Sequence, residues 1–170
     1  MAMLTVLLLL SAAFALGDAI SSGNRLCPRG WTQYGSRCFM FVKTARTWPE
    51  AEASCLLSTE ICISLEANLA SVHSSEEAQF LQGVVFSETG EFTPTWIGGM
   101  EAFGGLVGKG RLWIWSDGSK FDYQNWNQEE PNNNGGREQC IVMNFGGEQG
   151  WNDLECGNVL PSVCVVETFD

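Results

Sequence analysis

Seven cysteines in a chain of 170 residues constrain the fold more than any other feature of this sequence. The chain begins with an apolar run at residues 1–17 that ends in small residues and is typical of a secretory signal peptide, with cleavage after Gly17 or as late as Ala19. An uncleaved membrane anchor is the alternative, but the run is short for a membrane span. In a secreted chain of this size, seven cysteines predict a disulfide framework with one cysteine left over, and arithmetic alone does not assign the pairs.

The length of the chain predicts one domain. Roughly 150 residues follow the leader, which is enough for one sizeable core and too few for two. Residues 18–25 are expected to form a short tail and residues 26–168 the domain, without a second apolar run long enough to insert into a membrane. The formal net charge of −11 argues against nucleic acid or an anionic membrane as partner, because both require clustered Lys and Arg.

Local patterns predict two helices and several short strands. Residues 47–50 form a capping box with proline in the first turn, and residues 74–77 form a second capping box followed by apolar residues at helical spacing. Strands are expected at residues 38–42, 95–97, 112–115, 140–145 and 162–166. These elements indicate an α+β domain, in which the Gly- and Asn-rich residues 116–151 form long loops of the kind that usually carry function.

An acidic, amide-rich stretch near the C-terminus is the strongest functional signal. Carboxylate and amide oxygens are the hard donors that Ca²⁺ prefers. The candidate ligands are Glu130, Asn132, Glu138, Asn152 and Asp153. A solvated loop is the alternative for any acidic run, and we prefer it for Glu129, Glu148 and Glu155.

Read in order, these motifs resemble a C-type lectin domain. The resemblance rests first on Glu-Pro-Asn at 130–132 followed by Glu138, and on Trp-Asn-Asp at 151–153. Three further motifs agree: Cys-Pro-Arg-Gly-Trp at 27–31, Trp-Ile-Gly-Gly at 96–99 and Trp-Ile-Trp-Ser-Asp-Gly at 113–118. It covers almost the whole chain after the leader. It is most similar in kind to single-domain secreted fish lectins of the ladderlectin type, which in turn resemble type II antifreeze proteins. It implies two helices, short antiparallel strands, a long Ca²⁺-binding loop region and disulfide staples.

The resemblance also implies a disulfide pattern. The implied pairs are Cys27–Cys38, Cys55–Cys164 and Cys140–Cys156. Cys62 is then the odd cysteine, in a segment that carries more residues than the usual lectin pattern. A buried free thiol and an intermolecular disulfide that makes a homodimer both remain open.

Ca²⁺ is the implied cofactor, held by the five candidate ligands, with a sugar completing its coordination through two vicinal hydroxyls. The Glu130–Pro131 bond is expected to be cis, and the Glu-Pro-Asn order implies a preference for mannose or N-acetylglucosamine. Asn133 and Gln139 stand where a second, auxiliary ion would need acidic residues, so one principal ion is expected. Trp151, although close to the ligands, is expected to pack in the core rather than to stack on sugar.

The sequence therefore predicts a secreted Ca²⁺-dependent lectin that binds mannose-type glycans, with a role in innate recognition of microbial glycans. An enzyme is disfavoured because Glu130 and Glu138 are assigned to metal and no nucleophile–base pair is visible around the lone His73. An ice-binding protein of the type II antifreeze kind, on the same fold, is the main alternative. A protein-binding domain is the third.

Overall fold

The structure is a computed structural model that describes residues 27–57, 67–102 and 110–168. The expected signal peptide at 1–17, the tail at 18–25 and Cys62 lie outside these residues. Within the described ranges, no helix is long and apolar enough to cross a membrane.

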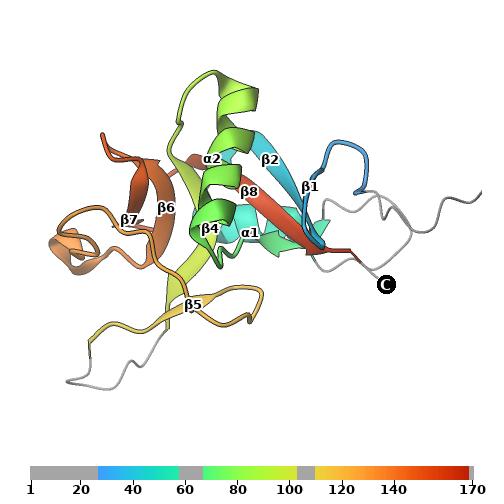
Figure 1. The fold of residues 1–170 in the computed structure, drawn as a ribbon. Helices are drawn as coiled ribbons and strands as arrows, with labels where there is room; N and C mark the ends of the chain where they lie inside the picture. The colour runs from blue at the N-terminus through green and yellow to red at the C-terminus, as the bar shows by residue number, and fades with distance from the viewer. Residues whose placement is uncertain (1–26, 58–66, 103–109, 169–170) are drawn as a thin grey trace, which may run out of the picture.

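Eight strands and two α-helices make up the described part of the chain (Figure 1). The strands are β1 (Thr32–Tyr34), β2 (Arg37–Arg46), β3 (Asn68–Leu69), β4 (Thr95–Glu101), β5 (Trp113–Trp115), β6 (Cys140–Phe145), β7 (Gly150–Leu154) and β8 (Leu160–Glu167). The helices are α1 (Trp48–Leu57) and α2 (Ser75–Thr89), and η1 (Asn134–Gly136) is a short 3-10 turn. The α+β prediction is confirmed, but the five expected strands correspond to β2, β4, β5, β6 and β8, so β1, β3 and β7 are additions.

The strands join into one sheet in the order β1-β2-β8-β4-β6-β7, with β3 beside β8 and β5 beside β4. Neighbouring strands run antiparallel except for β4 and β8, which are parallel where Trp96 meets Ser162. The strands are therefore mostly antiparallel, as expected, with one parallel contact. Because β1 and β7 are its two edges, the long loops before β6 lie at the opposite end of the molecule from β1 (Figure 1).

Both helices begin at the capping boxes that the sequence predicts. At α1, the Glu50 carboxylate accepts hydrogen bonds from the amide and hydroxyl of Thr47 at 3.1 and 2.7 Å. At α2, the Ser74 hydroxyl accepts from the Glu77 amide at 3.1 Å, but the Glu77 carboxylate accepts from His73 rather than from the Ser74 amide. In the second capping box, the hydrogen bond from the backbone to the Glu side chain is thus donated one residue earlier than in the standard motif.

The sheet carries a hydrophobic core on each face. One core includes Leu81 and Val85 of α2 with Phe39 and Ile97, and the other includes Trp48 and Ala51 of α1 with Leu69 and Trp96. Alternation along β2 explains the division, because Cys38 faces the second core and Phe39 the first. Trp48, Trp96, Trp113, Trp115 and Trp151 are all buried, as expected of core residues, whereas Trp31, also expected in the core, is half-buried against the second core.

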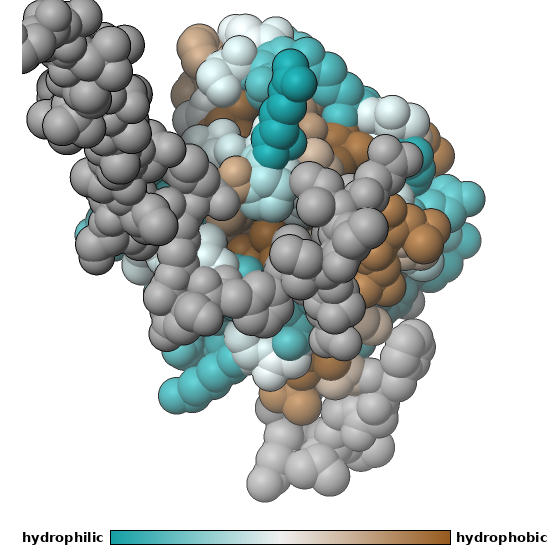
Figure 2. All heavy atoms as spheres, turned by 90° about the vertical axis from the view of Figure 1, so that its right-hand side faces the viewer, coloured by the Kyte–Doolittle hydropathy of each residue, from teal (hydrophilic) through white to brown (hydrophobic). Residues whose placement is uncertain are grey.

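Three disulfides staple the described residues, and they are the pairs that the resemblance implies: Cys27–Cys38, Cys55–Cys164 and Cys140–Cys156. The second and last described strands also meet, because β2 pairs with β8 and the Thr168 amide donates to the Ser36 carbonyl at 2.7 Å. Both ends of the described domain therefore lie on one side. Figure 2 views that side, and over its coloured part hydrophilic and hydrophobic side chains are mixed.

Candidate metal and carbohydrate site

The long loop between β5 and β6 is anchored to β7 at its middle. The Asn127 amide donates to the Trp151 carbonyl at 2.9 Å, and the Trp151 amide donates to the Asn125 carbonyl at 2.7 Å. The Asn127 side chain adds two bonds, to the Phe145 carbonyl at 2.8 Å and from the Gly150 amide at 2.9 Å. A Cβ on Gly150 would lie 2.5 Å from the Asn127 side-chain oxygen, so this contact requires glycine.

Trp151 sits in an aromatic bed beneath this loop. Its side chain is buried, and the rings of Trp115, Phe121, Tyr123 and Trp126 surround it with centroid distances of 5.6 to 6.3 Å. Most of these contacts are edge-on, the arrangement that aromatic rings favour. The structure thus places Trp151 in the core, and its role is to support the neighbouring Asn152 and Asp153.

Asp153 is the central residue of the candidate ligand set. Its side chain is fully buried on β7, although the sequence predicts no strand there. Its carboxylate accepts hydrogen bonds from the amides of Asn132 at 3.0 Å and Asn133 at 2.9 Å, and a third from Arg111. A buried carboxylate requires such partners, so Asp153 draws the start of the 132–139 loop onto β7.

The other candidate ligands lie close to Asp153. The Glu130 carboxylate accepts from the Asn132 amide at 3.0 Å and from its side-chain NH₂ at 2.8 Å, and the Glu130–Pro131 bond is cis. Glu138 is fixed at both ends, because its carboxylate accepts from the Asn134 amide at 2.6 Å and its amide donates to the Asn133 side chain at 3.1 Å. The buried Asn152 donates its side-chain NH₂ to the carbonyl of Asp153.

Electrostatic crowding marks this group of acids. The pKa of Glu130 is raised, first by partial burial and then by its hydrogen bond with Asp153 and the negative charges of Asp153 and Glu138. The carboxylates nevertheless engage their own loop amides, and among the described residues no three acidic, His or Cys side chains are grouped closely enough to hold a metal ion. Metal binding at these five residues would therefore require local side-chain rearrangement.

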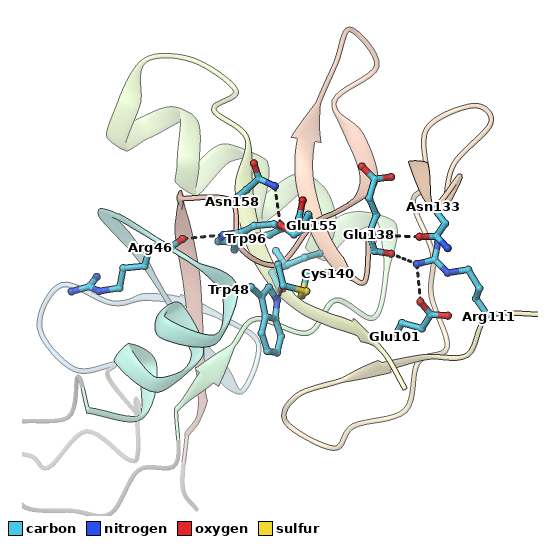
Figure 3. The surroundings of a disulfide bond; sticks show 12 residues. Arg46, Trp48, Trp96, Glu101, Arg111, Asn133, Glu138, Cys140, Glu155 and Asn158 are labelled. Atoms are coloured by element: carbon cyan, nitrogen blue, oxygen red, sulfur yellow. Dashed lines mark hydrogen bonds and ion pairs between the residues drawn. A yellow bond between two sulfur atoms is a disulfide. The ribbon is translucent and has the colours of Figure 1, made fainter. Parts of the chain in front are cut away.

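Arg111 is a participant that the sequence does not predict. It precedes β5, and its guanidinium contacts the Asp153 carboxylate. It also contacts the Glu138 carbonyl and, at 2.9 Å, the Glu101 carboxylate (Figure 3). The guanidinium carbon also lies 4.6 Å from the centroid of the Trp113 ring. Arg111 and Asp153 are 42 positions apart, so no local spacing links them.

A second polar cluster lies at the start of α2. The structure places the Ser71 hydroxyl 3.1 Å from His73 Nε2, and Asp122 Oδ1 3.1 Å from His73 Nδ1. The sequence shows no such nucleophile–base pair, because these residues are spread over fifty positions. The geometry is unsuited to nucleophilic attack, since Ser71 is fully buried and its hydroxyl is already bonded to Asp117 and Arg37.

Comparison with known proteins gives consistent results. The family model described as Lectin C-type domain matches residues 44–166. Ladderlectin of Oncorhynchus mykiss is 52% identical over 187 residues, which cover 95% of this chain and 92% of ladderlectin. Galactose-specific lectin nattectin of Thalassophryne nattereri is 38% identical over 153 residues, which cover 89% of this chain and 88% of nattectin. Among solved structures, herring type II antifreeze protein aligns with a TM-score of 0.69 and 31% identity over 85% of this chain and 100% of that one.

Proposed function

The chain belongs to the C-type lectin domain family, and on that basis we propose that it is a Ca²⁺-dependent carbohydrate-binding lectin. The observation that carries the proposal is the contact of buried Asp153 with the amides of Asn132 and Asn133. This contact brings the Glu-Pro-Asn segment beside the Trp-Asn-Asp segment of β7. Two motifs that are distant in sequence thereby contribute oxygen ligands to one place.

The donor set fits Ca²⁺ by its chemistry, since it offers carboxylate and amide oxygens without sulfur or imidazole. The residues that would hold the ion are Glu130, Asn132, Glu138, Asn152 and Asp153. The bound ion would supply coordination positions for two vicinal sugar hydroxyls. The Glu carboxylates would then accept hydrogen bonds from the hydroxyl groups, and the Asn NH₂ groups would donate hydrogen bonds to the hydroxyl oxygens. Each hydroxyl would thus have a complete set of partners.

The proposed preference is for mannose or N-acetylglucosamine. It rests on the order of Glu130 and Asn132 in this chain and on the resemblance drawn from it. One relative, at 38% identity, is named a galactose-specific lectin. The preference is therefore a property to be tested on this chain rather than transferred from relatives.

We place the lectin outside the cell, after removal of a signal peptide at residues 1–17, with residues 26–168 as the binding domain. Recognition of microbial glycans is the proposed role. A monosaccharide that contacts an ion through two hydroxyls buries little surface, so useful avidity requires several sites, which can add a factor of about 10² to 10⁴. A dimer linked through Cys62 would provide two.

An ice-binding function is the second candidate, and it is favoured by the 31% identity to a type II antifreeze protein along 85% of the chain. One type II antifreeze protein of known structure is described as Ca²⁺-dependent and another as calcium-independent, so ice binding on this fold occurs with and without the ion. Thermal hysteresis of the purified protein in Ca²⁺, with EDTA as comparison, measures this function directly. Hysteresis without sugar retention would favour ice binding.

The test of the main proposal is retention on mannose-agarose in millimolar Ca²⁺ followed by EDTA elution, with galactose-agarose in parallel. Wild type should be retained on mannose-agarose and released by EDTA. Glu130→Gln should not be retained, whereas Glu129→Gln, which removes the same charge from the exposed neighbour, should behave as wild type. Failure of wild type to bind either resin would overturn the proposal.

A further inference from the structure

We propose that the Arg111 guanidinium is a fixed internal cation for residues 130–139, the ligand loop. Arg111 holds Asp153 and the Glu138 main chain in place before any ion binds. The inference deepens the proposed function and rests on it, because it concerns the same site. In this role Arg111 is a positioning residue that does not touch the sugar. It would make the order of the loop largely independent of Ca²⁺.

The contacts of Arg111 join four separate parts of the chain. Arg111 lies just before β5. Its guanidinium reaches Glu101 at the end of β4 at 2.9 Å, Asp153 on β7 and the carbonyl of Glu138 just before β6. Figure 3 shows Arg111 lying between Glu101 and Glu138, with Asn133 beside them. Its fork of N–H donors suits several oxygens at once, which a single Lys ammonium does less well.

The burial of Asp153 explains why a cation is needed at this position. The side chain has no exposed surface, and an isolated buried carboxylate is strongly unfavourable. Two loop amides, those of Asn132 and Asn133, supply partial positive charge, and Arg111 supplies the only full positive charge that the described residues place in contact with this carboxylate. Without Arg111, the amides of the loop would be held by an uncompensated charge.

The neutral residues around Arg111 agree with this role. Asn133 and Gln139 stand where the lectin pattern would need acids for an auxiliary ion. Here the Asn133 side chain accepts from the Glu138 amide at 3.1 Å, and the Gln139 carbonyl accepts from the Glu101 amide at 2.8 Å. Protein groups thus hold the loop around the Arg111 guanidinium. The arginine supplies positive charge at the place where an auxiliary metal ion would otherwise supply it.

Arg111 also leaves capacity for the principal ion. A carboxylate offers about four acceptor positions, and Asp153 uses three of them in the structure. The Glu138 carboxylate accepts from the Asn134 amide, and the Glu130 carboxylate accepts from Asn132 and also contacts Asp153; neither carboxylate contacts Arg111 in the part of the chain that the structure describes. A divalent ion would therefore bind by rearranging the Glu130 and Glu138 side chains, while Arg111 keeps its place on Asp153.

The experiment compares wild type with Arg111→Gln, Arg111→Lys and the control Arg137→Gln, which removes the same charge from an exposed position in the same loop. Hydrogen exchange of the Asn132 and Asn133 amides is measured in EDTA, and the rise in melting temperature on adding Ca²⁺ is measured for each protein. In Arg111→Gln, both amides should exchange at least about tenfold faster than in wild type, because the carboxylate that holds them loses its charged partner. The melting-temperature rise with Ca²⁺ should grow, because the ion then supplies the missing order.

Arg111→Lys should lie between wild type and Arg111→Gln, and it also serves if Arg111→Gln is not secreted as a folded protein. Unchanged amide exchange in EDTA, or an equal change in Arg137→Gln, would refute the role of Arg111. Calorimetry of wild type with CaCl₂ separates the two ideas: the absence of binding would reject the proposed function, while amide exchange in EDTA would still decide whether Arg111 orders the loop.

Discussion

Two arginines organise acidic side chains in this domain, and their surroundings differ. Arg37 of β2 lies under the start of α2, where it pairs with Glu77 at 2.6 Å and donates to the hydroxyl and carbonyl of Ser71 at 2.6 and 3.2 Å. Its Nε approaches Glu167 at 3.2 Å as an ion pair without hydrogen-bond geometry. Arg111 likewise bridges carboxylates, but the carboxylates of Glu130 and Glu138 lie beside its cluster without contacting the guanidinium.

The difference separates structure from function. Around Arg37, the carboxylates of Glu77, Asp117 and Glu167 each lie within 3.9 Å of the guanidinium, so every acid of this cluster has the cation as a direct partner, and the cluster holds α2 against the sheet. Around Arg111, the carboxylates of Glu130 and Glu138 do not contact the cation, and the pKa of Glu130 is raised, first by its partial burial and further by Asp153 and the charge of Glu138. Partly buried carboxylates without a cationic partner destabilise the folded state. Such a group of residues is therefore a candidate site for binding a ligand.

Arg37→Ala should have the largest effect on stability. It leaves Glu77, whose side chain is 5% exposed, buried without its cation, and the free energy of unfolding should fall by about 3–5 kcal/mol. Urea denaturation in EDTA measures this. Lys43→Ala, which breaks the exposed pair with Glu88, should cost about 0–1 kcal/mol. Comparable losses from both variants would remove the distinction between the buried and exposed pairs.

Asp153→Asn should affect ligand binding more than any other single change in the loop. The substitution removes a carboxylate that is both a proposed ligand and the partner of Arg111, so Ca²⁺ affinity should fall at least about 100-fold. Isothermal titration with CaCl₂ is the measurement. Glu155→Gln, on the exposed residue two positions later, should titrate like wild type. Wild-type affinity in Asp153→Asn would contradict the assignment of Asp153.

Exchanging the two ligand types should change sugar choice while the fold is preserved. In Glu130→Gln with Asn132→Asp, the acceptor and donor that face each hydroxyl change places, so the ratio of mannose to galactose binding should fall by about tenfold or more. A glycan array in Ca²⁺ reads the ratio. The same ranking of sugars in the variant and wild type would show that specificity resides elsewhere.

Mild acid should produce the smallest effect, and only in the loop. Carboxylate ligands bind metal when ionised, so lowering the pH from 7 towards 5 should weaken Ca²⁺-dependent retention on mannose-agarose gradually. The Arg37 cluster has its partners within the protein, so the near-ultraviolet circular dichroism of the core should stay constant over this range. Retention that does not change with pH would argue against carboxylate coordination.

The sequence predicts those parts of the fold whose signals are local. The capping boxes at Thr47 and Ser74 mark both helix starts, and the apolar strands β2, β4, β6 and β8 are found where expected. The short β3 carries too few residues for a pattern. Strand β7 is missed because its Gly-Trp-Asn-Asp sequence is polar, and the buried position of Asp153 depends on partners from elsewhere in the chain.

The candidate site is predictable in composition but less so in arrangement. Spacing and resemblance predict the five candidate ligands, because the types of the residues and their order can be read from the sequence. Arg111 carries no such signal, since its partners Glu101, Glu138 and Asp153 come from three different strand ends. The Ser71, His73 and Asp122 cluster is hidden for the same reason, and only its burial distinguishes it from a catalytic arrangement.

The pairing of β2 with β8 determines from which side the domain can be tethered. The bond from Thr168 to Ser36 keeps both ends of the described domain at the β1 side, whereas β7 and the ligand loop lie at the far edge of the sheet (Figure 1). A tether at either end, to a bead, a fused module or a second copy, leaves the ligand loop pointing away from the tether. Arrays assembled through the chain ends would thus present all their binding loops outward to a surface.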